Sequence, residues 1–185
     1  MAWDTAETRR KLLTSATEHF ARSGFAGARV DAIARDAGVN KERIYQYFGD
    51  KAGLFAAVLD AEVNRLLDGI DLSGRGGAAL GALAGDLHDR ASEHPELTRL
   101  LLWESLELDG PVSAESRAVG CSRMVAAIEQ AAPRSTGGSA AETLLSIIAI
   151  AFADSCLPHL TSLITPNSSR EARRAAVVYQ ASTLA

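Results

Sequence analysis

Apolar residues recur along most of the chain at the three- and four-residue spacing that places them on one face of a helix. The first such stripe is expected to end at Gly24, because glycine readily adopts the left-handed conformation that often closes a helix. A second stripe covers residues 30–37 and a third covers residues 41–48. The pattern therefore predicts three short helices within the first fifty residues.

Only residues 38–40 separate the second stripe from the third. Gly38 lies at the end of the second stripe, and Asn40 is a favourable N-cap for the third, in which Ile44 and Phe48 face inward one turn apart. Two short helices joined by a three-residue turn that contains glycine are typical of a helix-turn-helix. We therefore predict a three-helix domain with a helix-turn-helix over residues 1–50.

The remaining residues, 51–185, are expected to form a larger helical domain. Asp50 can cap a fourth helix over residues 51–69, which is long enough to connect two domains. The glycine-rich residues 71–77 indicate a linker by composition. Further helices are expected at about residues 80–91, 95–108, 113–132, 140–164 and 170–184, which gives an all-α fold of about nine helices.

The last two of these helices each open with a capping box, Ser139 with Glu142 and Ser168 with Glu171. The helix over residues 140–164 is apolar around most of its circumference, so it needs partners on more than one side. Pro158 is expected to kink it. We therefore expect these two helices to form the interface of a homodimer.

The composition agrees with a helical chain and argues against some classes of function. The chain is 47% hydrophobic but only 5% aromatic, and its net charge is −4. The first sixty residues hold nine Lys or Arg against eight Asp or Glu, whereas the rest hold ten against fifteen. The net charge argues against a non-specific coat on nucleic acid, and the distribution joins an almost balanced first part to an acidic second part. Without an apolar leader or a long apolar run, we expect a cytoplasmic protein with no membrane partner.

The sequence contains few features of an enzyme. Its four histidines are scattered, and Cys121 and Cys156 lack the spacing of a metal site, so we expect no catalysis, no metal and no cofactor. Residues 74–79 formally fit the Gly-x-Gly-x-x-Ala pattern of dinucleotide sites, but a helix and a polar turn precede them instead of a strand. A flexible linker explains the same residues.

The third predicted helix has an unusual composition for a solvated helix. Its packing needs Ile44 and Phe48 only. Arg and Lys can pair with guanine, Gln with adenine and Glu with cytosine, while Tyr and Lys can anchor phosphates. Packing by the tyrosines, or a solvated charged face, would explain these residues singly but not together. The side chains left for solvent or for DNA are Lys41, Glu42, Arg43, Tyr45, Gln46 and Tyr47.

The run from Gly38 to Lys51, followed by Leu54 and Phe55, resembles the TetR family of bacterial regulators. Its Tyr-x-Tyr-Phe-x-x-Lys core is specific, and the similarity extends over about residues 8–60. The resemblance implies that base edges face Lys41, Glu42, Arg43, Tyr45 and Gln46, and that phosphates are held by Asn40, Tyr47 and Lys51.

Two positions depart from the family pattern. The family usually has hydroxyl residues where this chain has Ala28 and Arg29, so the phosphate contact expected there would have to come from Arg29. Gly53 lies inside the fourth helix where a good helix former is usual, at a cost of about 1 kcal/mol relative to Ala.

The resemblance implies a transcriptional regulator, a repressor that binds an inverted-repeat operator as a dimer and releases it when a small apolar ligand binds the helical domain. A helical ligand-binding or adaptor protein without DNA-binding activity is the alternative, but it leaves the composition of the third helix unexplained. A nucleotide-binding enzyme is a further, weaker alternative. Because pockets combine apolar walls with a few polar groups, the candidate ligand residues are Leu83, Leu87, His88, Arg99, Trp103, Glu104, Met124 and Phe152.

Overall fold

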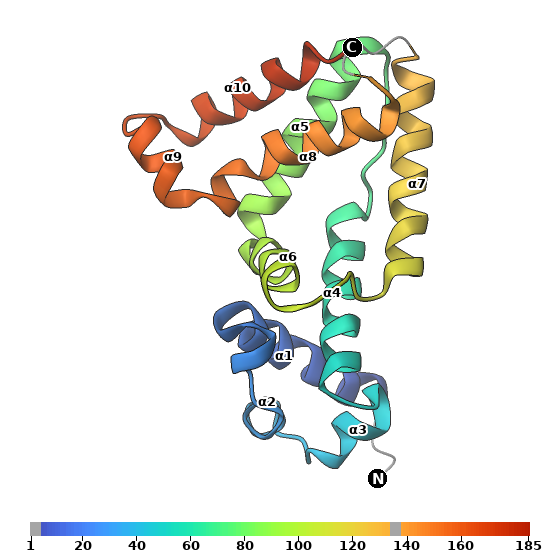
Figure 1. Ribbon diagram of the computed structural model, residues 1–185, viewed down its shortest axis with the longest axis vertical. Helices are drawn as coiled ribbons and strands as arrows, with labels where there is room; N and C mark the ends of the chain where they lie inside the picture. Colours follow the sequence, from blue (N-terminus) through green and yellow to red (C-terminus); the bar gives the residue numbers. More distant parts are fainter. Residues whose placement is uncertain (1–4, 134–137) are drawn as a thin grey trace. The chain divides into compact units, whose positions relative to one another are not determined.

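The computed structural model describes residues 5–133 and 138–185, and all regular structure in these ranges is helical, which confirms the expected all-α fold (Figure 1). The residues group into two units, Met1–Arg65 with Arg99–Ser116 (unit 1) and Leu66–Thr98 with Arg117–Ala185 (unit 2). The helices are α1 (Thr5–Gly27), α2 (Val30–Asp36), α3 (Glu42–Phe48), α4 (Lys51–Leu67), α5 (Gly76–Glu93), α6 (Pro95–Glu107), α7 (Ala114–Ala131), α8 (Ala140–Cys156), α9 (Pro158–Ile164) and α10 (Arg170–Ser182).

Three phenylalanine rings occupy the core of unit 1. Phe20 of α1 and Phe55 of α4 are fully buried and meet edge to face, with 5.0 Å between ring centroids. The Phe25 ring lies 5.5 Å from that of Phe55 and 6.3 Å from that of Phe20. It turns back into the core because Gly24, with φ of 71°, interrupts the helical geometry inside α1. The helix end expected at Gly24 is therefore a break, after which α1 continues to Gly27.

Gly24 also makes room for α6. A Cβ atom at residue 24 would lie 2.7 Å from the carboxylate of Glu107 and 2.9 Å from the ring of Trp103. Trp103 Nε1 donates a hydrogen bond to the Ala21 carbonyl at 3.2 Å, and Glu107 accepts one from the Ala26 amide at 2.9 Å. The end of α1 thus packs directly against the second half of α6.

The start of α4 explains the glycine that departs from the family pattern. Asp50 caps the helix as expected, since its Oδ1 accepts a hydrogen bond from the Gly53 amide at 2.7 Å. A Cβ atom at residue 53 would overlap the carbonyl oxygen of Phe48. The chain turns tightly between α3 and α4, with Gly49 at φ of 80°, and this close return requires glycine at position 53.

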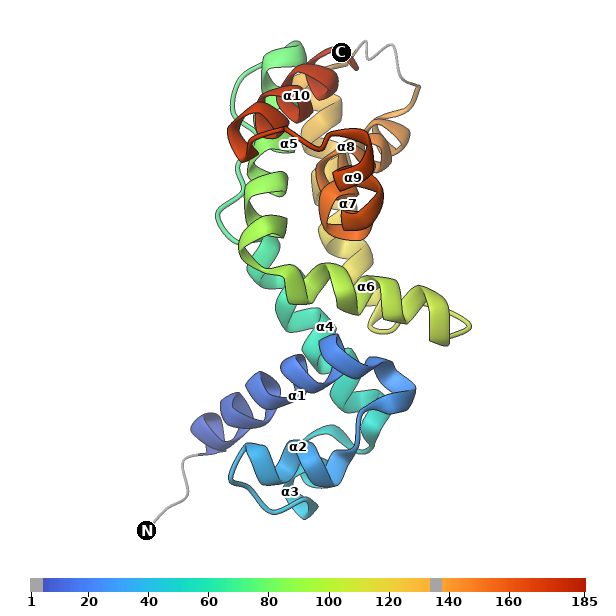
Figure 2. The ribbon, with the colours of Figure 1, turned by 90° about the vertical axis from the view of Figure 1, so that its left-hand side faces the viewer.

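Helix α5 is central to unit 2, where it packs against α8 and α10 (Figures 1 and 2). It approaches α10 through Gly77, Gly81 and Gly85, which share one face because they are four residues apart. Cβ atoms at Gly77 and Gly81 would collide with the carbonyl oxygens of Ser182 and Val178. The sequence-based linker over residues 71–77 is therefore too long by two residues, since α5 begins at Gly76 and Gly77 belongs to the helix contact.

The helix predicted over residues 140–164 is two helices. α8 ends at Cys156, α9 begins at Pro158, and their axes differ by 89°. A proline in the first turn of a helix leaves no hydrogen bond unmade, so Pro158 starts a new helix instead of kinking a longer one. Within the described residues no single helix is long and apolar enough to cross a membrane, and α8 with α9 meets that test only as a bent pair.

One of the two predicted capping boxes is confirmed and the other is wrong. Ser139 Oγ accepts from the Glu142 amide at 3.3 Å, and Glu142 accepts from the Ser139 amide at 2.9 Å. Helix α10 is capped by Ser169, not Ser168, through the Ala172 amide at 3.1 Å. Glu171 therefore lies one position too early for a box, and a hydrogen bond from its own backbone amide lowers the pKa of its carboxyl group.

Candidate nucleic-acid interface

Helices α2 and α3 are joined by a tight turn that hydrogen-bonds back onto α2. Gly38 adopts φ of 66°, and the Val39 amide donates to the Ala34 carbonyl at 2.9 Å. The N-cap of α3 is Lys41, one residue after the Asn40 cap expected from the sequence, although Asn40 Oδ1 still accepts a hydrogen bond from the Glu42 amide at 3.4 Å. The expected helix-turn-helix is therefore present.

Helix α3 is anchored on one side and exposed on the other. Ile44 is fully buried, whereas Tyr45 is 49% exposed. Arg43, Tyr47 and Phe48 are half-buried. A short helix that holds to the core by one face can present the other to the edges of bases in a major groove. The predicted contact residues that are exposed around this helix are Asn40, Lys41, Glu42, Tyr45 and Gln46.

Charged and polar side chains of this face have protein partners. Lys41 Nζ lies 3.0 Å from Asp31 Oδ1 on α2, and this hydrogen bond raises the pKa of Lys41. Arg43 donates to Gln46 Oε1 at 3.0 Å. Lys41 and Asp31 are both largely exposed, where an ion pair contributes little to stability. These side chains can therefore exchange their partners for a phosphate or a base at small cost.

The other predicted phosphate contacts have different surroundings. Lys51 Nζ donates to the Ala26 carbonyl at 3.2 Å and lies 5.0 Å from the ring centroid of Phe25. Arg29 is exposed at the N-cap of α2 and makes no side-chain cap hydrogen bond, so α2 lacks the hydroxyl cap usual at this position. Tyr47 packs edge to face on Phe48 at 6.2 Å. Their contacts with DNA stay predictions.

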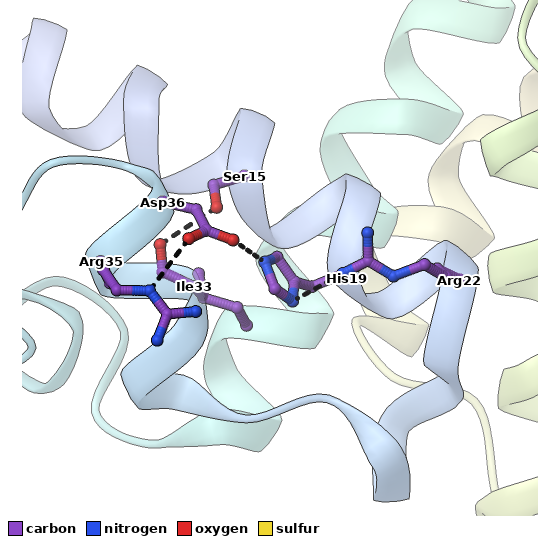
Figure 3. A network of polar contacts seen from close by, with 6 residues as sticks. All are labelled: Ser15, His19, Arg22, Ile33, Arg35 and Asp36. Carbon is purple, nitrogen blue, oxygen red and sulfur yellow. Dashed lines mark hydrogen bonds and ion pairs between the residues drawn. The ribbon is translucent and has the colours of Figure 1, made fainter.

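Polar contacts fasten α2 to α1 (Figure 3). Ser15 Oγ donates to the Ile33 carbonyl at 3.0 Å. His19 Nε2 lies 2.8 Å from Asp36 Oδ2, and Asp36 Oδ1 accepts from Arg35 Nε at 3.3 Å. The hydrogen bond with His19 is the main cause that lowers the pKa of Asp36. Sequence reasoning missed this network; its only signal is a serine and a histidine one turn apart on α1, and their partners lie on another helix.

The candidate ligand residues divide between the two units. Trp103 and Glu104 belong to unit 1, where Glu104 Oε1 accepts from the Val112 amide at 2.8 Å. Arg99, in the same unit, is exposed. That these three residues line one ligand pocket with the remaining candidates stays a prediction. In unit 2, Leu83, Leu87, His88 and Phe152 are buried and Met124 is half-buried.

A cavity of about 380 Å³ opens in unit 2 among α5, α8, α9 and α10. Of the predicted ligand residues it includes only His88, a buried side chain whose Nδ1 lies 3.2 Å from the Ala151 carbonyl. Arg173 also lines it and donates to Asp154 at 2.7 Å. The rest of its lining consists mainly of serine, threonine and proline. The large apolar side chains expected to line a ligand site, Leu83, Leu87, Met124 and Phe152, are not part of this lining.

Over residues 5–133 and 138–185, no three His, Cys, Asp or Glu side chains gather closely enough to hold a metal ion.

Two family models match the chain. One describes bacterial regulatory proteins of the tetR family and matches residues 12–58, and the other describes tetracyclin repressor-like C-terminal domains and matches residues 79–182. The helix-turn-helix lies within the first match and the helices of unit 2 lie largely within the second.

Curated relatives match about half of the chain. The HTH-type transcriptional repressor SCO4008 of Streptomyces coelicolor is 40% identical over 111 residues, which are 57% of this chain and 54% of that protein. The HTH-type transcriptional repressor NicS of Pseudomonas putida is 35% identical over 107 residues, 54% of this chain and 49% of that protein. The alignments thus span about half the length of these relatives.

Solved structures match nearly the whole fold. That of SCO4942, a candidate transcriptional regulator from Streptomyces coelicolor, has a TM-score of 0.77 and 32% identity, covering 94% of this chain and 96% of that one. The transcriptional regulator FadR of Bacillus subtilis, solved with stearoyl-CoA, has a TM-score of 0.71 and covers 95% and 98%. Its identity of 14% makes it a likeness of fold alone.

Proposed function

Because this chain belongs to the TetR family of bacterial regulatory proteins, we propose that it is a cytoplasmic DNA-binding transcriptional regulator, a repressor that binds an inverted-repeat operator as a dimer. In this proposal residues 1–50 form the DNA-binding domain, residues 51–69 the connecting helix, and the rest a domain for ligand binding and dimerisation. Members of this family are transcription factors and not enzymes. The observation that carries the proposal is the exposed polar and aromatic face of α3.

The proposed contacts follow from the chemistry of that face. Arg43 would donate to guanine O6 and N7, Gln46 would pair with adenine, and Glu42 would accept from cytosine. A good bidentate pair contributes about 1–3 kcal/mol of discrimination against the wrong base. Lys41 and Tyr45 would also face base edges. Phosphates would be held by Asn40, Tyr47 and Lys51 around α3, and by Arg29 at the start of α2.

Selection of duplexes from a random pool, at one fixed salt concentration, tests this function. We expect an inverted repeat, and we expect Arg43→Ala to lose roughly tenfold or more in affinity and to relax the preference at one position of each half-site. Arg123→Ala, which removes an exposed cation on α7, is the matched control and should bind like the wild type. A wild-type protein that enriches no duplex would contradict the proposal and favour the ligand-binding or adaptor alternative.

The proposed dimer interface lies on the last helices of unit 2. Large apolar side chains are exposed on or beside α8, α9 and α10, and exposed patches of this kind mark interaction surfaces. Burying them between two copies of the chain would place the α3 helices of both copies in successive major grooves of DNA, about 34 Å apart. The exposed side chains are Leu145, Leu157, Leu160, Leu163, Ile164 and Tyr179.

A charge placed on this face should separate the copies. Leu163 is 78% exposed, so Leu163→Lys should leave the fold intact but produce a monomer in sedimentation experiments, with weak operator binding. Leu106 on α6 is 75% exposed, and Leu106→Lys makes the same chemical change away from the proposed interface. Dissociation by Leu106→Lys and not by Leu163→Lys would show that the interface lies elsewhere.

A small molecule that binds unit 2 would relieve repression in this proposal. The apolar candidates Leu83, Leu87, Met124 and Phe152 remain, with His88 as the polar contact that is also part of the described cavity. Trp103, Glu104 and Arg99 remain candidates from the sequence alone. Once a molecule that releases the operator is found, its effect on His88→Gln decides whether His88 contacts it. An unchanged concentration for half-release would remove His88 from the site.

A further inference from the structure

The position of α3 depends on the last turn of α2. The Gly38 amide donates to the Arg35 carbonyl at 3.0 Å, and the Val39 amide donates to the Ala34 carbonyl at 2.9 Å, so the turn that leads into α3 is built on this end of α2. A helix of seven residues is far too short to hold its own shape in water. The contacts that hold the end of α2 in place therefore also hold the start of α3 in place.

Few contacts are available to fix it. Ile33 and Ala34 are the two buried residues of α2, while Arg35 and Asp36 in its last turn are exposed. Asp36 is also an anion at the end of a helix where the backbone carbonyls point, which is unfavourable unless donors offset it. His19 meets Asp36 from α1, and its side chain is only 10% exposed. The imidazole therefore joins a solvated carboxylate to the packed interior of unit 1.

The partners of His19 define which of its nitrogens carries the proton (Figure 3). Arg22 lies 3.3 Å from Nδ1, and a guanidinium group can only donate. Nδ1 must then be the acceptor, which leaves the proton on Nε2, 2.8 Å from Asp36 Oδ2. The imidazole thus donates to Asp36 on α2 and accepts from Arg22 on its own helix.

We infer that His19 is a positioning residue for DNA binding: its Nε2–H donates to Asp36, holds the last turn of α2 against α1, and thereby sets the place of α3. This inference rests on the proposed function, because the position of α3 matters only if α3 reads DNA. Neither hydrogen-bond partner of His19 is a proposed DNA contact, so His19 acts on α3 through Asp36.

Substitution of His19 by glutamine or by asparagine distinguishes the roles of the two ring nitrogens. In His19→Gln the side-chain amide nitrogen can reach the position of Nε2 and donate to Asp36. In His19→Asn the amide oxygen can take the place of Nδ1, but the shorter side chain cannot reach Asp36. Suppose that without this bond α2 keeps its position about one third of the time. A dimer that needs both of its DNA-binding domains in place is then competent about one ninth of the time, so its affinity falls by about tenfold.

The experiment measures affinity for the selected operator by fluorescence anisotropy, together with thermal unfolding of the same full-length proteins. We expect His19→Asn and Asp36→Ala each to bind about tenfold more weakly, His19→Gln to bind nearly like the wild type, and the double variant His19→Asn with Asp36→Ala to bind no worse than either single one. The ¹⁵N shifts of the wild-type imidazole should report a proton on Nε2.

The outcomes separate this inference from the proposed function. Wild-type protein that binds an inverted repeat while Asp36→Ala binds equally well would overturn the inference and leave the function standing. Additive losses in the double variant, or equal losses in His19→Gln and His19→Asn, would also overturn it. If His19→Asn does not fold, Asp36→Ala and His19→Gln decide, because Asp36 is exposed and Gln keeps the donor. A wild-type protein that selects no duplex overturns both.

Discussion

Gly81→Ala tests whether the backbones of α5 and α10 are in direct contact. In the interior of an ordinary exposed helix this substitution stabilises by about 1 kcal/mol, because glycine is the more flexible residue in the unfolded chain. Here the new Cβ atom would lie 2.8 Å from the carbonyl oxygen of Val178 and 3.2 Å from its Cγ1. The side chain could adjust, but the carbonyl belongs to α10 and cannot rotate away.

The magnitude follows from these two effects. Overpacking of a close-packed interior costs about 1–3 kcal/mol, since the helices must separate by several tenths of an ångström along their contact. After the gain of about 1 kcal/mol in helix propensity, we expect Gly81→Ala to lower the free energy of unfolding by about 1 kcal/mol. At Gly85 the nearest atoms, 3.0 Å away, belong to the side chains of Arg174 and Val178. Gly85→Ala should therefore be close to neutral.

Denaturant unfolding, at one protein concentration because a dimer's stability depends on it, measures these differences. Ala82→Gly is the matched control, since Ala82 is exposed on the same helix and should lose about 1 kcal/mol through propensity alone. A Gly81→Ala protein that is more stable than the wild type by about 1 kcal/mol would refute the reasoning. It would mean that α5 and α10 do not meet at this carbonyl.

Two further predictions concern unit 1. Gly24→Ala should lower the free energy of unfolding by about 2–4 kcal/mol, because a backbone at φ of 71° and ψ of 179° lies in a region that only glycine adopts readily, at a cost of about 1–3 kcal/mol to alanine, and the new Cβ would also meet Glu107 and Trp103. Gly38→Ala, also at positive φ but in open space, should lose less. Calorimetry of both variants checks this, and equal losses would remove the role of α6. The second concerns Asp36, whose folded-state pKa lies below the usual 3.8. Its stabilisation is complete above that value and disappears as pH falls through the lower folded value. The stability gap between wild type and Asp36→Asn should therefore close in acid, and a gap that widens there would contradict the assignment.

Local signals predicted most of the helix boundaries because capping and glycine conformation act within a few residues. Gly24, Gly38 and Asp50 have the conformation or the hydrogen bond that their types favour. The same signals fail where the local sequence is compatible with two helix ends or two caps equally well. Ser168 and Ser169 could each cap α10, and the box with Glu171 favoured the wrong one. Pro158 can kink a helix or begin one, and the sequence pattern is apolar in both cases.

Contacts between distant residues could not be predicted in this way. Trp103 was predicted to line a ligand pocket because pockets combine apolar walls with a few polar groups, yet its indole nitrogen donates to the carbonyl of Ala21, 82 positions earlier. Nothing within a few residues of Trp103 indicates that partner. Similarly, Gly77 was assigned to a linker by composition, whereas a Cβ atom there would collide with the Ser182 carbonyl of α10. Composition identified this glycine as unusual, and only the packing gives the reason.

In the proposed complex with DNA, the exposed face of α3 would gain selectivity from the partners that its side chains already have. Lys41 bonds to Asp31 and Arg43 to Gln46, so each would give up a protein hydrogen bond when it meets DNA. A phosphate or a matching base restores what is lost, but a mismatched base leaves Arg43 and Gln46 with fewer hydrogen bonds than in the free protein. Discrimination then arises from the difference between two exchanges and not from the strength of one contact. In such a complex, the fixed position proposed for α3 would make that difference larger.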